Sequence, residues 1–176
     1  ALTQLQATLA SAPPEAEQAA LLSLQARILL AQGKHQAALG TLRQSRRLHQ
    51  QLGALSAWVN DTLVASYVHI EHTQQFAQAT KLLHTLAAPP ATFANWPQHY
   101  PAGAAQWPYY DGLLQLAQSN LRRAAQLLTQ AQQRSHQLQL TYQAHASSMV
   151  LANTLQRLGR YQDALHLLQR IAKAQT

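Results

Sequence analysis

The amino-acid sequence predicts an all-α fold, and three observations support that prediction. Ala, Leu and Gln, which favour helices, are abundant in the chain of 176 residues, whereas aromatic residues make up only 6%. Glycine is scarce, and five of the seven prolines fall in one stretch. Apolar residues recur at the three- and four-residue intervals of amphipathic helices, with short turns between them. We therefore expect a right-handed α-solenoid, a stack of about four helical hairpins.

The elements follow in order along the chain. An orphan helix within residues 1–14 opens it as a partial unit, and the two prolines at its end stop the helix. Gly33 is placed to end the first helix of the first hairpin in a left-handed conformation, and Gly53 closes the second. The four hairpins are expected over residues 19–53, 57–88, 105–137 and 141–173. We expect residues 1–176 to form a single superhelical domain, a fragment of a larger protein.

A proline-rich segment over residues 88–108 interrupts the pattern. Its five prolines forbid a continuous helix, so we expect a long loop. Pro108 suits a helix start, where its missing N–H costs nothing. Five large aromatic residues concentrate within fifteen positions in and just after this segment: Trp96, Tyr100, Trp107, Tyr109 and Tyr110. One interpretation is that they form part of a ligand pocket over a groove, because Trp and Tyr are enriched at binding hot spots. The alternative, which we favour, is that they plug a gap between the second and third hairpins.

Small residues recur where the helices of a hairpin should meet. Two antiparallel helices approach closely only where a small side chain faces the partner helix. The expected second helices align on Ala38, Ala79, Ala124 and Ala164. Twelve positions earlier, three of the four first helices carry a small residue, and Tyr67 of the second hairpin is the exception. We therefore expect the hairpins to close on these positions, with the second hairpin degenerate.

These motifs resemble the tetratricopeptide repeat family. The segments that carry the resemblance are Gly33-Lys34-His35…Ala38…Leu42, Gly159-Arg160-Tyr161…Ala164…Leu168, Gly112…Ala124…Leu128, and, in the opening helix, Ala1, Leu5 and Pro13. The repeat near 40 residues exceeds the ~34 usual in the family. It is similar to the arrays of bacterial signalling proteins, including maltose-regulator-type transcription activators. The resemblance implies a binding scaffold with a concave groove lined by the first helices.

The resemblance also implies which residues line that groove. Carried over by helix face, they are Ser23, Arg27, Val64, Val68, Tyr109, Leu113, Met149, Asn153 and Arg157. Asn153 and Arg157 lie four apart, and both can bind the backbone or a carboxylate of a ligand. A solvated polar face is the alternative interpretation. The clamp with which some members of the family grip acidic peptide C-termini is not reproduced, because Val64 and Val68 stand where polar residues are needed.

The net charge of +7 comes from a shortage of acids, since 13 Lys and Arg face only 6 Asp and Glu. Basic residues such as Arg43, Arg46 and Arg47 gather on the expected second helices. A basic excess can indicate nucleic-acid binding, but no recognition motif accompanies it here. A solvated basic face is the favoured interpretation, and an acidic partner domain is a further alternative.

No pattern in the chain indicates catalysis, a metal or a cofactor. Phosphate-binding loops, nucleophile elbows and zinc-protease motifs do not occur in the sequence. His69 and His72 can share an ion, but chance pairing is expected among nine histidines, and no further ligands accompany them. There is no cysteine and no apolar run near the ~20 residues of a membrane span, so we expect a cytoplasmic protein.

The function we expect is protein or ligand binding rather than enzymatic activity. The chain would be the sensory or regulatory region of a larger bacterial signal-transduction or transcription-regulatory protein. The alternatives are a free-standing assembly adaptor and, less favoured, a nucleic-acid-associated helical repeat. The expected partner is a protein or peptide. A small-molecule effector and self-association stay open alternatives.

Overall fold

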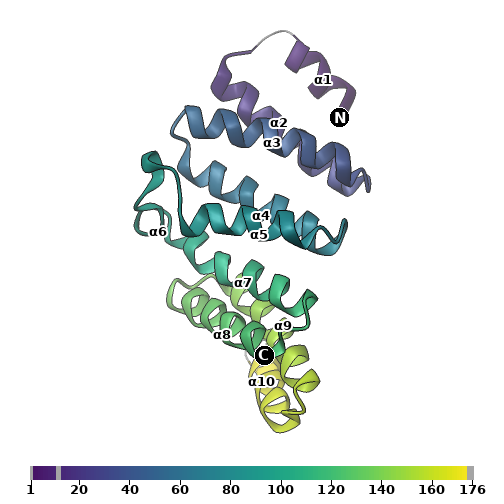
Figure 1. Cartoon of the computed structure of the whole chain (residues 1–176), viewed down its shortest axis with the longest axis vertical. Helices are drawn as coiled ribbons and strands as arrows, with labels where there is room; N and C mark the ends of the chain where they lie inside the picture. Colours follow the sequence, from purple (N-terminus) through teal and green to yellow (C-terminus); the bar gives the residue numbers. More distant parts are fainter. Residues whose placement is uncertain (1, 11–12, 174–176) are drawn as a thin grey trace. The chain divides into compact units, whose positions relative to one another are not determined.

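The chain folds into helices, as expected. The computed structural model describes residues 2–10 and 13–173, and these ranges contain 84% helix and no strand (Figure 1). Ala1, part of the predicted opening helix, lies outside the described residues. The elements are α1 (Leu2–Ala10), α2 (Glu15–Ala31), α3 (His35–Gln51), α4 (Leu55–Glu71), α5 (Phe76–Ala87), the 3₁₀ helix η1 (Ala91–Phe93), α6 (Trp96–His99), α7 (Pro101–Ala117), α8 (Leu121–Gln137), α9 (Thr141–Arg157) and α10 (Tyr161–Lys173).

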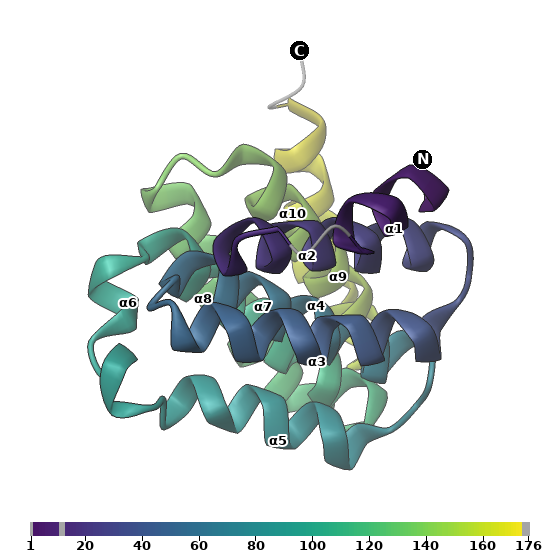
Figure 2. The same ribbon diagram turned by 90° about the horizontal axis from the view of Figure 1, so that it is seen from above.

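Two compact units make up the chain, unit 1 (Ala1–Trp96) and unit 2 (Pro97–Thr176). In unit 1 each helix from α1 to α5 packs on the next, and in unit 2 the helices α7 to α10 do the same (Figures 1 and 2). Helices therefore pair with their neighbours in sequence, as hairpins require. The single domain predicted over residues 1–176 and the handedness of the stack stay predictions.

The turns between the long helices share one geometry. In the described part of the chain, the second residue before a helix takes the left-handed conformation at Gly33, Gly53, Gln74, Ser119, Gln139 and Gly159. The next backbone N–H then bonds to a carbonyl near the end of the preceding helix, as from Lys34 to Leu29 at 2.9 Å. The prediction for Gly33 and Gly53 is confirmed. Non-glycine residues take the same conformation at Gln74, Ser119 and Gln139, where composition gave no signal.

Three consecutive helices of unit 1 correspond to three consecutive helices of unit 2, with an offset of 86 residues. Helices α2, α3 and α4 have 17 residues each, and so do α7, α8 and α9. Their first residues are Glu15, His35 and Leu55 in unit 1 and, 86 positions later, Pro101, Leu121 and Thr141 in unit 2. We call residues related by this offset equivalent positions.

A hydrogen bond between α3 and α4 recurs at the equivalent positions of α8 and α9. In unit 1, Arg46 Nε donates to Thr62 Oγ1 at 2.9 Å. In unit 2, Gln132 Nε2 donates to Ser148 Oγ at 2.8 Å. The offset therefore relates side-chain contacts as well as helix lengths, so one unit can serve as a structural reference for the other.

The alanines expected to close each hairpin, Ala38, Ala79, Ala124 and Ala164, are all buried. Gly112 faces α8 so closely that a Cβ atom there would lie 2.9 Å from Leu128 Cγ. The prediction for Tyr67 is corrected. Its side chain is 37% exposed, and the small buried residue of α4 is the adjacent Ser66. The reason is the α4–α5 turn, in which the Gln75 N–H bonds to the His69 carbonyl at 2.9 Å, six positions back rather than five.

The proline-rich segment differs from the predicted loop. Residues 88–100 hold η1 and the short α6, but α7 begins at Pro101 and runs through Pro108 (Figure 2). Pro108 has no N–H for the carbonyl of Ala104, four positions back. The guanidinium of Arg134 donates to that carbonyl instead, at 3.3 Å. A contact from α8 thus replaces the bond that the proline removes, so Pro108 is an interior residue rather than a helix start.

Candidate functional site

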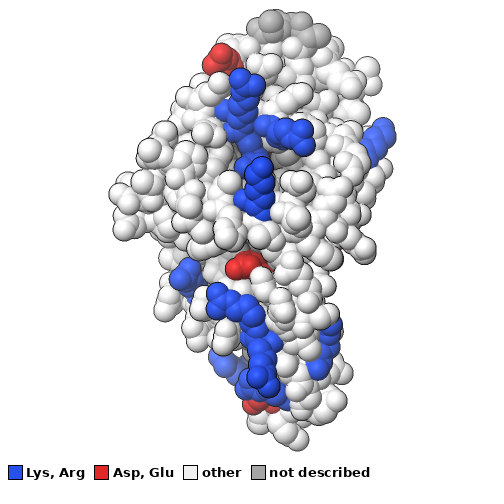
Figure 3. All heavy atoms as spheres, in the orientation of Figure 1, with Lys and Arg blue, Asp and Glu red and all other residues white. Residues whose placement is uncertain are grey.

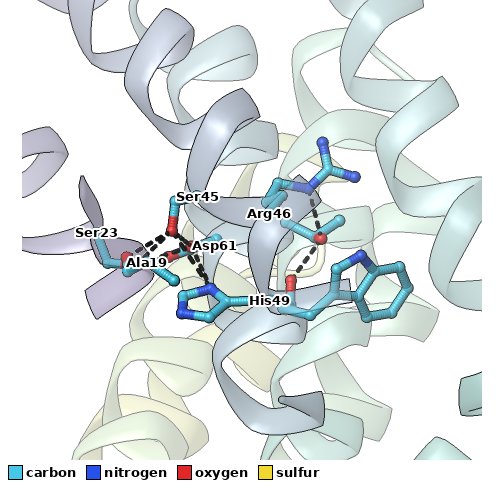
Figure 4. Close-up of polar contacts among 8 residues, drawn as sticks. Ala19, Ser23, Ser45, Arg46, His49 and Asp61 are labelled. Carbon is cyan, nitrogen blue, oxygen red and sulfur yellow. Dashed lines mark hydrogen bonds and ion pairs between the residues drawn. The ribbon is translucent and has the colours of Figure 1, made fainter. Parts of the chain in front are cut away.

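Four polar side chains from three helices meet inside unit 1 (Figure 4). They are Ser23 of α2, Ser45 and His49 of α3, and Asp61 of α4. Ser45, His49 and Asp61 are buried, and Asp61 is only 3% exposed. We call these four residues the Asp61 cluster. A buried carboxylate is costly unless it is paired and hydrogen-bonded, so its partners decide what the cluster can do.

Each partner in the cluster approaches the Asp61 carboxylate. Ser45 Oγ donates to Asp61 Oδ2 at 2.6 Å, and Ser23 Oγ lies 2.9 Å from the same oxygen. His49 Nδ1 lies 3.1 Å from Oδ2. The other carboxylate oxygen, Oδ1, is 3.1 Å from Ser23 Oγ. The imidazole Nδ1 therefore faces the carboxylate, and the Nε2 atom is on the opposite edge of the ring (Figure 4).

Serine, histidine and aspartate together invite comparison with a nucleophilic triad. In a triad the serine bonds to one ring nitrogen of histidine and the aspartate to the other. Here Ser45 Oγ, at 3.3 Å, and Asp61 Oδ2 approach the same nitrogen, His49 Nδ1. The Ser45 hydroxyl also donates to the carboxylate rather than to a base. The cluster thus has the residue types of a triad without its geometry.

Basic residues of α3 lie close to the cluster. Burial lowers the pKa of Arg46 below its ordinary value, the Asp61 carboxylate acts to raise it, and Arg43 acts to lower it. Asp61 therefore shares its surroundings with a guanidinium as well as with His49. On the face displayed in Figure 3, Lys and Arg side chains form groups, whereas acidic side chains are few.

A hollow of about 320 Å³ opens beside the cluster. Its polar lining comprises Ser23, Arg27, His49, Ser56, Asn60 and Asp61. These side chains belong to α2 and α4, except for His49 of α3. Carboxylate and hydroxyl oxygens accept hydrogen bonds, whereas guanidinium and amide nitrogens donate them. The hollow therefore offers both kinds of group, and the predicted site residue Arg27 lies at it.

Unit 2 shows which part of this arrangement the fold requires. The positions equivalent to Ser45, His49 and Asp61 carry Ala131, Ser135 and Ser147, and Tyr109 replaces Ser23. Helices α7, α8 and α9 nevertheless have the same lengths and neighbours as α2, α3 and α4. The three-helix arrangement therefore forms without a buried carboxylate.

Several other predicted site residues lie in the core. Val68 is fully buried with Ala26 and Leu42, and Leu113 is also buried. Val68 does not line a surface, whereas its neighbour Tyr67 is exposed. The Trp96 indole is buried, and its Nε1 donates to the Leu86 carbonyl at 2.7 Å.

The remaining aromatic residues occupy α7 or its start. Tyr100 immediately precedes the helix, and Trp107, Tyr109 and Tyr110 lie within it, all partly buried. The rings of Tyr109 and Tyr110 meet edge to face with centroids 5.4 Å apart, and Tyr109 packs on the core of unit 2. Trp107, Tyr109 and Tyr110 are therefore helical rather than part of a loop.

On α9, Met149, Asn153 and Arg157 are all exposed and lie four positions apart, so the predicted shared face is present.

The Asp61 cluster was missed at the level of sequence. One signal was available, since Asp61 is an acid in the polar run Asn60-Asp61-Thr62, which interrupts the apolar residues Val59 and Leu63 of α4. The His69 and His72 side chains, considered above as an alternative metal site, have other partners. His72 stacks on His35 with ring centroids 4.1 Å apart, and His69 Nδ1 lies 3.2 Å from Thr73 Oγ1. Among the described residues, no three potential metal ligands of the His, Cys, Asp or Glu type lie together.

No protein-family model matches the chain, and a search of curated proteins also finds no match. Within residues 2–10 and 13–173, none of the helices combines the length and apolar character needed to cross a membrane.

Proposed function

We propose that this chain is a binding scaffold of tetratricopeptide-like hairpins, and that the hollow beside the Asp61 cluster receives an extended segment of a partner protein. The observation that carries the proposal is the contrast between the units. A buried carboxylate with its hydrogen-bonding partners lies in unit 1. The equivalent helices of unit 2 pack without a buried carboxylate. A feature that is costly and not needed for packing is a candidate for selection by function.

The chemistry of the hollow favours a peptide backbone as the bound group. A backbone offers alternating N–H donors and C=O acceptors. Asp61 and Ser56 can accept hydrogen bonds from the backbone N–H groups, and Arg27 can donate hydrogen bonds to the backbone carbonyls. In a tetratricopeptide-like array, the first helices of successive hairpins would line the groove, and α2 and α4 are those helices in unit 1. We extend the proposal to a right-handed array of about four hairpins plus an orphan helix, serving as the regulatory region of a larger bacterial signalling or transcription-regulatory protein.

Selection of peptides from a displayed random library tests the proposal. Peptides enriched on the unsubstituted chain should bind the Ser56→Trp variant at least about tenfold more weakly, because the indole fills the hollow. Tyr142→Trp, at the equivalent exposed position of unit 2, is the matched control and should leave binding unchanged. Asp61→Asn should weaken binding while keeping the side-chain shape. Selected peptides that bind Ser56→Trp as tightly as the unsubstituted chain, or a library that yields none, would contradict the proposal.

A further inference from the structure

Unit 2 contains a second hollow, distinct from the one beside the Asp61 cluster. It has a volume of about 440 Å³ and lies among the end of α8, the start of α9 and the end of α10. Its lining includes Ser135, His136, Ala144, Ser148, Leu167 and Arg170. None of these residues belongs to the site proposed above, so the hollow is a separate candidate binding site.

One of the lining positions differs greatly in size between the two units. Ala144 of unit 2 is equivalent to Trp58 of unit 1. The Trp58 indole is only 2% exposed and packs on Phe93, with ring centroids 4.9 Å apart. In unit 1 aromatic rings therefore fill the place, whereas in unit 2 the buried Ala144 presents only a methyl group to the lining of the hollow. The shape of the fold at this point suits a flat, apolar body.

A buried hydroxyl lines the open hollow without a partner. Ser135 is 1% exposed, and its Oγ has no hydrogen-bond partner in the described part of the chain. The equivalent position in unit 1 carries His49, which is bonded to Asp61. Buried polar atoms are nearly always hydrogen-bonded, because an unpaired one costs about 1–3 kcal/mol. A ligand that accepts a hydrogen bond from Ser135 would remove that cost.

The charge of the lining favours an anion. It contains Arg170 together with His136 and His145, and among its described residues none is acidic. Helix α9 begins at Thr141 in the lining, and no side chain caps its first turn. The N-terminus of a helix carries partial positive charge and unpaired N–H groups, so it attracts negative groups.

We propose that the hollow of unit 2 binds a small organic anion, a carboxylate attached to a flat apolar body such as an aromatic ring. The ring lies beside Ala144 and Leu167, where unit 1 places an indole, and the carboxylate meets Arg170 and accepts a hydrogen bond from Ser135. An aromatic side chain of a protein segment, as Phe93 is in unit 1, would fill the same space without needing the positive charge. The contribution of charge therefore separates the two occupants.

Calorimetric titration with indole-3-acetate and with its uncharged analogue indole-3-acetamide tests the proposal. The acetate should bind, and the acetamide should bind at least about tenfold more weakly. Arg170→Gln should reduce the affinity for the acetate to near that for the acetamide, whereas Arg123→Gln, an exposed control on α8, should not. Ala144→Trp should abolish binding of both, since it copies the filled arrangement of unit 1. Equal affinities for acetate and acetamide, unchanged binding by the Arg170 or Ala144 variant, or no binding of either probe would overturn it.

Ser135→Ala provides a second readout that does not depend on filling the hollow. The variant should bind indole-3-acetate more weakly, because a hydrogen-bond donor is lost. Without any probe, its free energy of unfolding should equal or exceed that of the unsubstituted chain, because an unpaired buried hydroxyl is removed. A less stable variant with unchanged affinity for the acetate would show that Ser135 serves packing and would contradict its proposed role.

Discussion

At the scale of single residues, the turns store unfavourable backbone conformations. Gln74, Ser119 and Gln139 have φ angles of 52°, 63° and 56°, which a residue with a Cβ atom rarely adopts. Two other turns place glycine at the corresponding position: Gly33, where φ is 72°, and Gly53. The left-handed conformation costs a residue other than glycine about 1–2 kcal/mol. The hydrogen bonds of the turn and the packing of the next helix hold these residues in place.

Replacing Gln139 by glycine should therefore stabilise the chain. We expect the free energy of unfolding to rise by up to about 1 kcal/mol, part of the gain being offset by the greater freedom of glycine in the unfolded chain. Urea titration followed by circular dichroism measures the change. The converse substitution, Gly33→Ala, should lower the free energy of unfolding by a similar amount. If both substitutions left it unchanged, the left-handed turn would not carry the strain assigned to it.

The buried carboxylate of Asp61 could be predicted from the sequence only in part. Asp61 was recognisable in the sequence as an acid in a polar break between apolar residues of α4, but its partners were not. Ser23 lies 38 positions away and Ser45 lies 16 positions away. Contacts across three helices depend on the crossing of those helices, which the local pattern of residues does not contain.

At the scale of elements, the helical hairpins were predictable because their signals are local. The apolar period and the buried small residues, such as Ala38 and Gly112, follow from the packing of neighbouring helices. The register of α4 was wrong by one position, because the turn after α4 closes with a bond from the Gln75 N–H to the carbonyl six positions back rather than five. The start of α7 was also wrong, since the compensation for Pro108 comes from Arg134 on the next helix.

The contact between Arg134 and Ala104 can be tested by a double-mutant cycle. Arg134→Ala should lower the free energy of unfolding by up to about 1 kcal/mol, because the Ala104 carbonyl loses its donor. In a Pro108→Ala background the helix supplies its own N–H to that carbonyl, so the Arg134 substitution should have little effect. Denaturant unfolding of the four proteins gives the coupling free energy. A coupling of zero would show that Arg134 does not compensate for the proline.

At the scale of the whole molecule, the same three-helix arrangement occurs in both units with different side chains at the equivalent positions. Unit 1 places a buried carboxylate at the junction of α2, α3 and α4 and fills the end of α5 with aromatic rings. Unit 2 carries no acid at the equivalent positions and has a hollow of its own. The helical scaffold is therefore separable from the groups that it presents, as expected of a repeat protein whose positions vary independently of its packing.

The measurement that tests this account most directly is the stability of a chain in which three of the four residues of the Asp61 cluster are replaced by those at the equivalent positions of unit 2. The substitutions are Ser45→Ala, His49→Ser and Asp61→Ser. If the cluster serves binding rather than packing, the free energy of unfolding should stay within about 1 kcal/mol of the original value or rise, because a buried charge and its partners are removed together. A loss of about 3–5 kcal/mol, the range for a disrupted buried ion pair, would show that unit 1 depends on the Asp61 cluster for its fold.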